Sequence, residues 1–406
     1  MYFFTHTFSN GLKIIHLPSE SDVAHCGLII NAGSRDEKDG EQGIAHFIEH
    51  LIFKGTKKRK AFHVLSRMDD IGGEINAYTS KEETCIHTSF IKEEYQRALE
   101  LLSDIITNST FPLQEMDKER NVIIDEINSY LDNPAEAIYD DFEELVFKNQ
   151  PLGNNILGNP ANLRKFTKDD IEEFIAKNYI PNHMVIGSVG KIKFSKLIHF
   201  VEKYFGGLRT AYNESSRVRF LGYTPAQHTA NKNTNQVHCM IGNITYDMYH
   251  PENYTMALLD NLIGGPGLNN RLNMLLREKL GYVYHVESNY SAFTDVGLFS
   301  VYFGTEPKKL DKTLQQVMKE FKNLREKKLG AIQLSKAKKQ LYGQIAINAE
   351  NKSALMLSAS KNYLMKNQID SLQDIYRKIE QISANDILAT ANKVLEPDNL
   401  SLLIYK

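Results

Sequence analysis

The sequence predicts an α+β protein with two structurally related domains, each built on a mostly antiparallel sheet flanked by helices. A length of 406 residues is long for one hydrophobic core and fits two domains of about 200 residues. The predicted elements also occur in the same order in both halves, which indicates an internal duplication. A polar, charged stretch separates the halves. We therefore expect an N-terminal domain at 1–210, a linker at 211–222 and a C-terminal domain at 223–406.

The N-terminal half begins with strands and continues mainly with helices. Asn10-Gly11 is a typical hairpin turn, and the residues after it alternate as in a strand. Thr167 has the position of a helix cap, with acidic residues in the first turn after it. We predict strands at 12–17, 25–31, 83–91 and 184–192, and helices at 43–56, 61–70, 93–108, 119–131, 134–147, 167–179 and 196–208.

The C-terminal half repeats this order. We predict a strand at 238–246, a helix at 254–264, a strand pair at 287–304, helices at 309–324 and 331–346, and a closing strand at 400–406. The H-x-x-E-H motif described below occurs in the first half and has no counterpart in the second. Only the N-terminal domain is therefore expected to hold a metal.

The composition excludes several function classes. A hydrophobic content of 42% and a charged content of 24% are ordinary for a globular protein, and a net charge of −2 gives no reason to expect nucleic acid as a partner. The first twenty residues do not resemble a secretory signal, and no run reaches the ~18 apolar residues of a membrane helix. Three cysteines without C-x-x-C pairing suit a reducing compartment. These features predict a cytoplasmic protein without a membrane segment.

The segment Gly43–Thr56, with the sequence GIAHFIEHLIFKGT, is apolar nearly all the way round and predicts a buried helix. His46 and His50 lie one turn apart on the same face, with Glu49 beside them. Burying two imidazoles and a carboxylate costs several kcal/mol unless a partner such as a metal ion satisfies them. A match to H-x-x-E-H also arises by chance in roughly a few per cent of chains of this size, so a third ligand is needed.

A third ligand is available on the helix that includes ERNVIIDEINSY. Glu119 and Glu126 are two helical turns apart and point the same way. An H-x-x-E-H motif followed by a distant helical carboxylate is the inverted zinc-protease arrangement. A catalytic zinc site uses three protein ligands and keeps one position open, whereas a structural site has four. A structural zinc protein therefore remains an alternative that a fourth ligand would favour.

In these motifs the chain resembles the family of pitrilysin, insulysin and the mitochondrial processing peptidase. That family combines H-x-x-E-H with E-x6-E some seventy-odd residues later. The resemblance implies that His46, His50 and Glu126 bind one zinc ion per chain, that Glu49 is the general base and that Glu119 is a supporting acid. The flanking AGSRDE and FKGT also match the family's pattern and extend the resemblance past the five-residue motif, and the resemblance as a whole covers most of the chain.

The resemblance implies further substrate-contacting residues. Arg277 and Tyr284, seven apart after the glycine-rich GGPGLNN, match a pair that holds the substrate carbonyl and its oxyanion. Without the resemblance, Arg277 would be read as a solvated residue and Tyr284 as a core residue, and Arg271 is a competing choice with no tyrosine at that spacing. Asn76 and Ala77 match an edge strand on which a peptide pairs by strand addition. Their alternative interpretation is an ordinary sheet edge.

The implied function is that of a zinc metalloendopeptidase with a processing-peptidase-like fold. It would hydrolyse peptides or unfolded polypeptide segments with metal-activated water, with no acyl-enzyme. Because the chain carries both the zinc set and the Arg/Tyr pair, two copies would complete each other's sites, and we expect a homodimer. A heterodimer with a paralogue is a further possibility. The alternative function is a non-catalytic structural or partner subunit of the same family.

Overall fold

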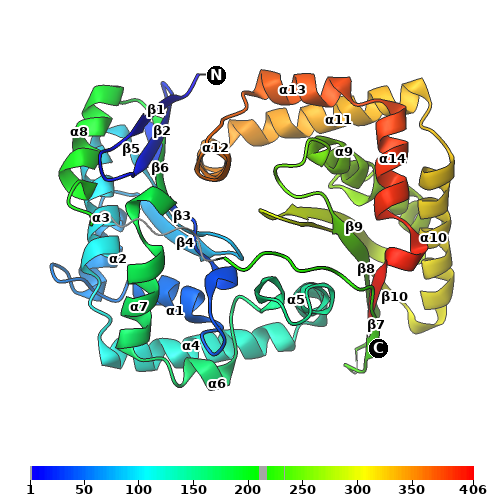
Figure 1. Ribbon diagram of the computed structural model, residues 1–406, viewed down its shortest axis with the longest axis horizontal. Coiled ribbons are helices and arrows are strands. Elements are labelled where there is room, and N and C mark those ends of the chain that lie inside the picture. The colour runs from blue at the N-terminus through cyan, green and yellow to red at the C-terminus, as the bar shows by residue number, and fades with distance from the viewer. Residues whose placement is uncertain (1, 210–216, 233) are drawn as a thin grey trace. The chain divides into compact units, whose positions relative to one another are not determined.

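The computed structural model describes residues 2–209, 217–232 and 234–406, and the chain divides into two compact units (Figure 1). Unit 1 comprises Met1–Ile127, Asn154–Val218 and Ile347–Ser371. Unit 2 comprises Asn128–Gly153, Arg219–Ala346 and Leu372–Lys406. Residues 211–216 of the predicted linker lie outside the described residues.

Unit 1 is built on a six-stranded sheet with the order β1-β2-β6-β3-β5-β4. β2 and β6 run parallel, and all the other neighbours are antiparallel. The strands are β1 (Phe4–Thr7), β2 (Lys13–Pro18), β3 (Val23–Ile30), β4 (Glu74–Thr79), β5 (Thr84–Ile91) and β6 (Met184–Gly190). β4 therefore lies at an edge of the sheet, with one side of its backbone unpaired among the described strands.

Unit 2 contains a five-stranded sheet with the order β7-β11-β8-β10-β9. Its strands are β7 (Gln227–Ala230), β8 (Val237–Thr245), β9 (Val283–Ala292), β10 (Gly297–Thr305) and β11 (Ser401–Tyr405). β7 and β11 are parallel and the rest antiparallel, so this sheet repeats the order and directions of β2, β6, β3, β5 and β4. The prediction of an α+β fold with two related, mostly antiparallel sheets is confirmed.

Helices flank both sheets (Figure 1). Those that begin in unit 1 are α1 (Ile44–Leu51), α2 (Ala61–Asp69), α3 (Tyr95–Asn108), α4 (Leu113–Leu131), α6 (Pro160–Leu163), α7 (Lys168–Asn178), α8 (Phe194–Phe205) and α12 (Lys352–Lys366). Those that begin in unit 2 are α5 (Pro134–Val146), α9 (Asn253–Gly264), α10 (Leu310–Glu326), α11 (Ala331–Glu350), α13 (Leu372–Gln381) and α14 (Ala384–Val394), with a π-helix at Asn273–Lys279. The last three α-helices of the chain were not predicted.

The helix predicted at 43–56 is shorter than expected, because α1 ends at Leu51. Gly55 has φ of 130°, and Thr56 pairs with Ser109 in an isolated bridge, so the backbone leaves the helix there. The remaining α1 is buried as predicted. Ile44, Phe47 and other apolar side chains of α1 belong to the main hydrophobic core of unit 1.

Each unit also takes one helix from the other half of the sequence. α12 packs on β6, β3 and β2 of unit 1, whereas α5 packs on β8 and β11 of unit 2. Ile138 and Phe142 of α5 are buried in a cluster with Met240 and Leu403 of that sheet, which explains the exchange. The compact units thus differ from the predicted ranges 1–210 and 223–406 by these segments.

Among the described residues, no helix combines the length and the apolar character that crossing a membrane requires.

Candidate functional site

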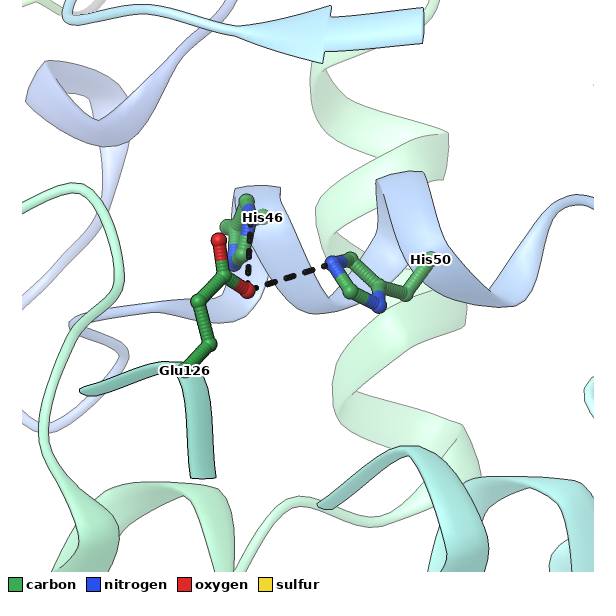
Figure 2. A group of neighbouring side chains, drawn as sticks. All are labelled: His46, His50 and Glu126. Atoms are coloured by element: carbon green, nitrogen blue, oxygen red, sulfur yellow. Dashed lines mark ion pairs between the residues drawn. The ribbon is translucent and has the colours of Figure 1, made fainter. Parts of the chain in front are cut away.

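Helices α1 and α4 bring two histidines and a glutamate together (Figure 2). Oε2 of Glu126 lies 3.7 Å from Nε2 of His50 and 3.9 Å from Nε2 of His46. The imidazole rings lie one helical turn apart with centroids at 4.7 Å. His46 is buried at 7% exposure, whereas the Glu126 side chain is 38% exposed, so the group opens on the side of the carboxylate.

These three residues fit a zinc ion. Their ligand atoms lie within 4.8 Å of one another. A tetrahedral zinc with bonds of about 2.1 Å separates its ligands by about 3.4 Å, close to the observed distances. A metal ion between the three groups would place a positive charge between Glu126 Oε2 and the two Nε2 atoms, which lie 3.7 and 3.9 Å from it. Two imidazoles and one carboxylate form the donor set of a three-ligand zinc site.

Glu119 contacts His50 at Nδ1, the ring nitrogen on the side away from Glu126, and Lys54 contacts Glu119. The Nδ1–H of His50 donates to Oε2 of Glu119 at 3.1 Å, because a carboxylate can only accept. This bond leaves Nε2 of His50 with a lone pair directed at Glu126. The Nζ of Lys54 lies 2.7 Å from the other oxygen of Glu119, so the buried Glu119 links the half-buried His50 and Lys54. Such carboxylate-histidine contacts orient metal ligands and raise their basicity.

His46 differs from His50 in this respect. Its Nδ1 is buried and has no hydrogen-bond partner among the described residues. Burial, with a smaller contribution from His50, lowers the pKa of His46 to about 3. The imidazole is therefore neutral at physiological pH, which is the form that binds a metal.

Glu49 lies next to the group without belonging to it. Its Oε2 accepts a hydrogen bond of 2.7 Å from the hydroxyl of Thr79, the last residue of β4. Burial raises the pKa of Glu49 above its usual value, while the Thr79 hydrogen bond acts in the opposite direction. The arrangement provides a positioned carboxylate with an increased affinity for a proton.

Strand β4 carries the two residues predicted to contact a peptide. Asn76 is exposed and pairs with His87 of β5, whereas the side chain of Ala77 packs against the core of unit 1. Successive residues of a strand point to opposite faces. Any contact of Ala77 with a peptide would therefore involve its backbone.

Arg277 and Tyr284 both lie in unit 2 and line one cavity of about 200 Å³, together with the glycine-rich turn 264–267. Arg277 belongs to the π-helix and is partly exposed, 3.7 Å from Glu278. Tyr284 on β9 is 85% exposed, so it is not a core residue. The competing Arg271 is held in an ion pair of 2.5 Å with Glu320. The structure brings the predicted pair to one cavity wall and leaves both side chains accessible.

Sequence reasoning missed Lys54 and Thr79. Lys54 follows His50 by four residues and lies in the FKGT stretch, so its position one turn further along could have indicated it. Thr79 gave no such signal, because its contact with Glu49 joins a strand to a helix thirty residues away.

The comparisons with known proteins identify a family. The model of the insulinase family, peptidase family M16, matches residues 14–160, and that of the peptidase M16 inactive domain matches residues 165–341. An uncharacterized zinc protease of Rickettsia felis is 34% identical over 397 residues, which cover 97% of this chain and 95% of the relative. The uncharacterized zinc protease YmxG of Bacillus subtilis is 30% identical over 401 residues, covering 98% and 97%.

Solved structures share the fold along the whole chain. A crystal structure described as a protease from Helicobacter pylori has a TM-score of 0.90 at 22% identity and covers 100% of this chain and 99% of its own. A structure from Pseudomonas fluorescens, described as a peptidase M16 inactive domain, has a TM-score of 0.92 at 18% identity, with coverages of 100% and 98%. With the two family models matching most of the sequence, the chain belongs to the insulinase family of peptidases, peptidase family M16.

Proposed function

We propose that this chain is a zinc-dependent endopeptidase that hydrolyses peptides or unfolded polypeptide segments. The observation that carries the proposal is the convergence of His46, His50 and Glu126 beside the half-buried carboxylate of Glu49. Relatives named as zinc proteases support the same class of activity. When bound, a zinc ion would act as a Lewis acid that lowers the pKa of water from 15.7 to about 7.

Glu49 is the proposed general base. It accepts a proton from the attacking water, whose oxygen bonds to the peptide carbonyl carbon, and then donates a proton to the leaving amine as the C–N bond breaks. The hydrogen bond from the hydroxyl of Thr79 to Oε2 keeps this carboxylate oriented. Glu119 keeps His50 in the required tautomer. No covalent acyl-enzyme is needed.

Substrate binding is proposed to involve the edge strand β4 and the Arg277/Tyr284 pair. The unpaired side of β4 can accept an extended peptide as an additional strand, with Asn76 exposed beside it. Arg277 and Tyr284 would stabilise the oxyanion of the tetrahedral intermediate. Their exposure supports a contact with a ligand, since neither side chain is used by the core.

We further propose a two-fold symmetric homodimer in which the Arg277/Tyr284 pair of each copy completes the site of the other. Mixing a Glu49→Gln chain with an Arg277→Ala chain should then restore part of the activity that both parents lack. A mixture as inactive as its parents would reject sharing between copies and leave the peptidase proposal standing. A heterodimer with a paralogue would appear as a different partner in the purified complex.

The decisive experiment measures zinc content and cleavage of a quenched peptide library, with and without chelator. Glu49→Gln should retain one zinc per chain and lose at least about a thousandfold in kcat, because the base is gone. Glu172→Gln, an exposed change on α7, is the matched control and should be fully active. A zinc-loaded wild type that cleaves nothing would indicate a non-catalytic subunit, and a zinc bound by a fourth protein ligand would indicate a structural site.

A further inference from the structure

The turn Gly33–Glu37 contacts the end of strand β4. The backbone N–H groups of Ser34 and Arg35 donate to the carbonyl oxygens of Ser80 and Lys81, at 3.1 and 2.8 Å. These acceptors follow directly after Thr79, the residue that donates to Glu49. The turn approaches so closely that a Cβ on Gly33 would lie 2.2 Å from the oxygen of Ser80. The position of Thr79 is therefore tied to this turn.

The same turn also holds the helix that carries Glu49. The carboxylate of Glu37 accepts from the backbone N–H groups of Gly43 and Ala45, at 3.1 and 3.0 Å, and is buried at 5% exposure. Gly43 itself offers no side chain to cap α1, so Glu37 takes the role of the cap from six residues upstream. Both partners of the Glu49–Thr79 hydrogen bond are thus anchored on five consecutive residues.

Arg217, from a distant part of the sequence, binds the side chain of Asp36 in this turn. The guanidinium of Arg217 makes a two-pronged contact with Asp36, at 3.0 and 2.8 Å, and also donates to Asn31 and to the carbonyl oxygen of Glu82. Its side chain is only 9% exposed. Glu82 lies in the turn between β4 and β5, so one guanidinium bridges the Gly33–Glu37 turn and the turn that follows Thr79.

The bridge belongs to a buried set of four charges. Arg35 donates to the carboxylate of Glu82 at 2.7 Å and to the carbonyl oxygen of Val218 at 2.9 Å. Two guanidinium groups and the carboxylates of Asp36 and Glu82 balance one another, and all four side chains are at least nine-tenths buried. Such a group has few alternative arrangements, because moving one member leaves a buried charge without its partner.

We propose that Arg217 is a positioning residue for Glu49. By bridging Asp36 and the carbonyl of Glu82, it keeps the two turns in the relative position that lets Thr79 donate to the carboxylate. Arg217 lies within the predicted linker at 211–222, so this segment contains a residue that shapes the site. The effect on catalysis rests on the proposed function, whereas the effect on the two turns does not.

The structural part is tested by native-state hydrogen exchange on the full chain, with and without zinc. In Arg217→Ala the amides of Ser34, Arg35 and Ser80 should exchange at least about tenfold faster, because the bridge that holds them is lost. Arg219→Ala, an exposed change two residues later, is the matched control and should leave them unchanged. Equal protection in Arg217→Ala and wild type would overturn the proposal.

The catalytic part is tested by kinetics of the zinc-loaded protein. Arg217→Ala should lower kcat by about 10- to 100-fold with KM and zinc content unchanged, since no metal ligand contacts the bridge. Arg217→Lys keeps the charge without the planar fork and should show a similar loss; it also covers the case in which the alanine variant folds poorly. Full kcat in Arg217→Lys would overturn the proposed bridge geometry.

A double variant separates positioning from general destabilisation. If Arg217 acts through Thr79, the double variant that combines Thr79→Val and Arg217→Ala should have the same kcat as the single variant Thr79→Val. Fully additive losses would reject this route. A zinc-loaded wild type without any cleavage would instead reject the proposed function, and the exchange measurement would still decide whether Arg217 holds the two turns.

Discussion

The two units use one sheet topology, and among the described residues only unit 1 carries a group of side chains that could hold a metal ion. α1 follows β3 in unit 1 as α9 follows β8 in unit 2, yet α9 contains no histidine. α4 presents Glu119 and Glu126, whereas α11 has one acidic residue, Glu350, at its end. The comparison shows that the fold supplies positions for helices beside a sheet, and that a few side chains on them decide which copy can do chemistry.

The largest effect that this comparison predicts is the loss of zinc binding when a candidate ligand on α1 is removed. His46→Ala should abolish zinc binding and with it all peptide cleavage, because two ligands do not hold the ion. Metal analysis of the purified chain checks this. Asp260→Asn on α9, a helix that carries none of the three candidate ligands, is the control and should leave the zinc content unchanged. Full zinc in His46→Ala would place the metal elsewhere.

The second prediction concerns equivalent strands that carry a buried and an exposed histidine. His16 on β2 is fully buried, and burial lowers its pKa to about 4, whereas His228 on β7 is exposed. A depressed folded pKa gives stability that is present above the unfolded pKa of 6.5 and is lost as the pH falls toward 4. Between these two pKa values the free energy of unfolding should fall by about 3 kcal/mol because of His16.

Urea denaturation of the metal-free chain at pH 7 and at pH 4.5 measures this loss. His16→Gln should remove most of it by flattening the dependence on pH, while His228→Gln should leave the dependence as in the wild type. An unchanged slope in His16→Gln would show that other groups cause the acid sensitivity of unit 1.

The third prediction sharpens the difference between α4 and α11. Glu119→Gln should keep the fold and lower the affinity for zinc by about 10- to 100-fold, because the amide cannot hold His50 and Lys54 as the carboxylate does. Competition with a chelator of known affinity measures it. Glu350→Gln on α11 is the control. Unaltered affinity in Glu119→Gln would leave the carboxylate without a role in metal binding.

The smallest effect concerns the exchanged helices. α12 approaches the sheet of unit 1 over Gly27 and Gly187, whereas α5 packs on the larger Met240 and Leu403 of the sheet of unit 2. A Cβ on Gly187 would lie 2.1 Å from the hydroxyl oxygen of Ser360. Gly187→Ala should therefore lower the free energy of unfolding by about 1–2 kcal/mol through overpacking.

Chemical denaturation compares Gly187→Ala with Gly207→Ala, where an added Cβ meets nothing within 4 Å. Equal stability of the two variants would mean that α12 adjusts its distance from the sheet without cost.

Much of the fold followed from local patterns. Thr167 caps α7 as predicted, with the reciprocal contact of Asp170, and Gly206 follows the end of α8. The helices α12–α14 were not predicted, although the sequence carries signals for α14: Ser383 caps it with Asp386, and Ile387, Ala391 and Val394 form a buried stripe at helical spacing. The end of α1 was misplaced, since the bridge between Thr56 and Ser109 depends on a segment fifty residues away.

The amino-acid sequence by itself determined which residues could meet a metal. A spacing of four residues places His46 and His50 on one face of α1, and a spacing of seven places Glu119 and Glu126 on one face of α4. Both placements depend only on the 3.6 residues per helical turn. Only the tertiary structure decided that Lys54 supports Glu119, that Thr79 holds Glu49 and that Arg217 reaches Asp36. The two members of each pair are far apart in sequence and meet only when the sheet and the helices pack, so no local pattern encodes these contacts.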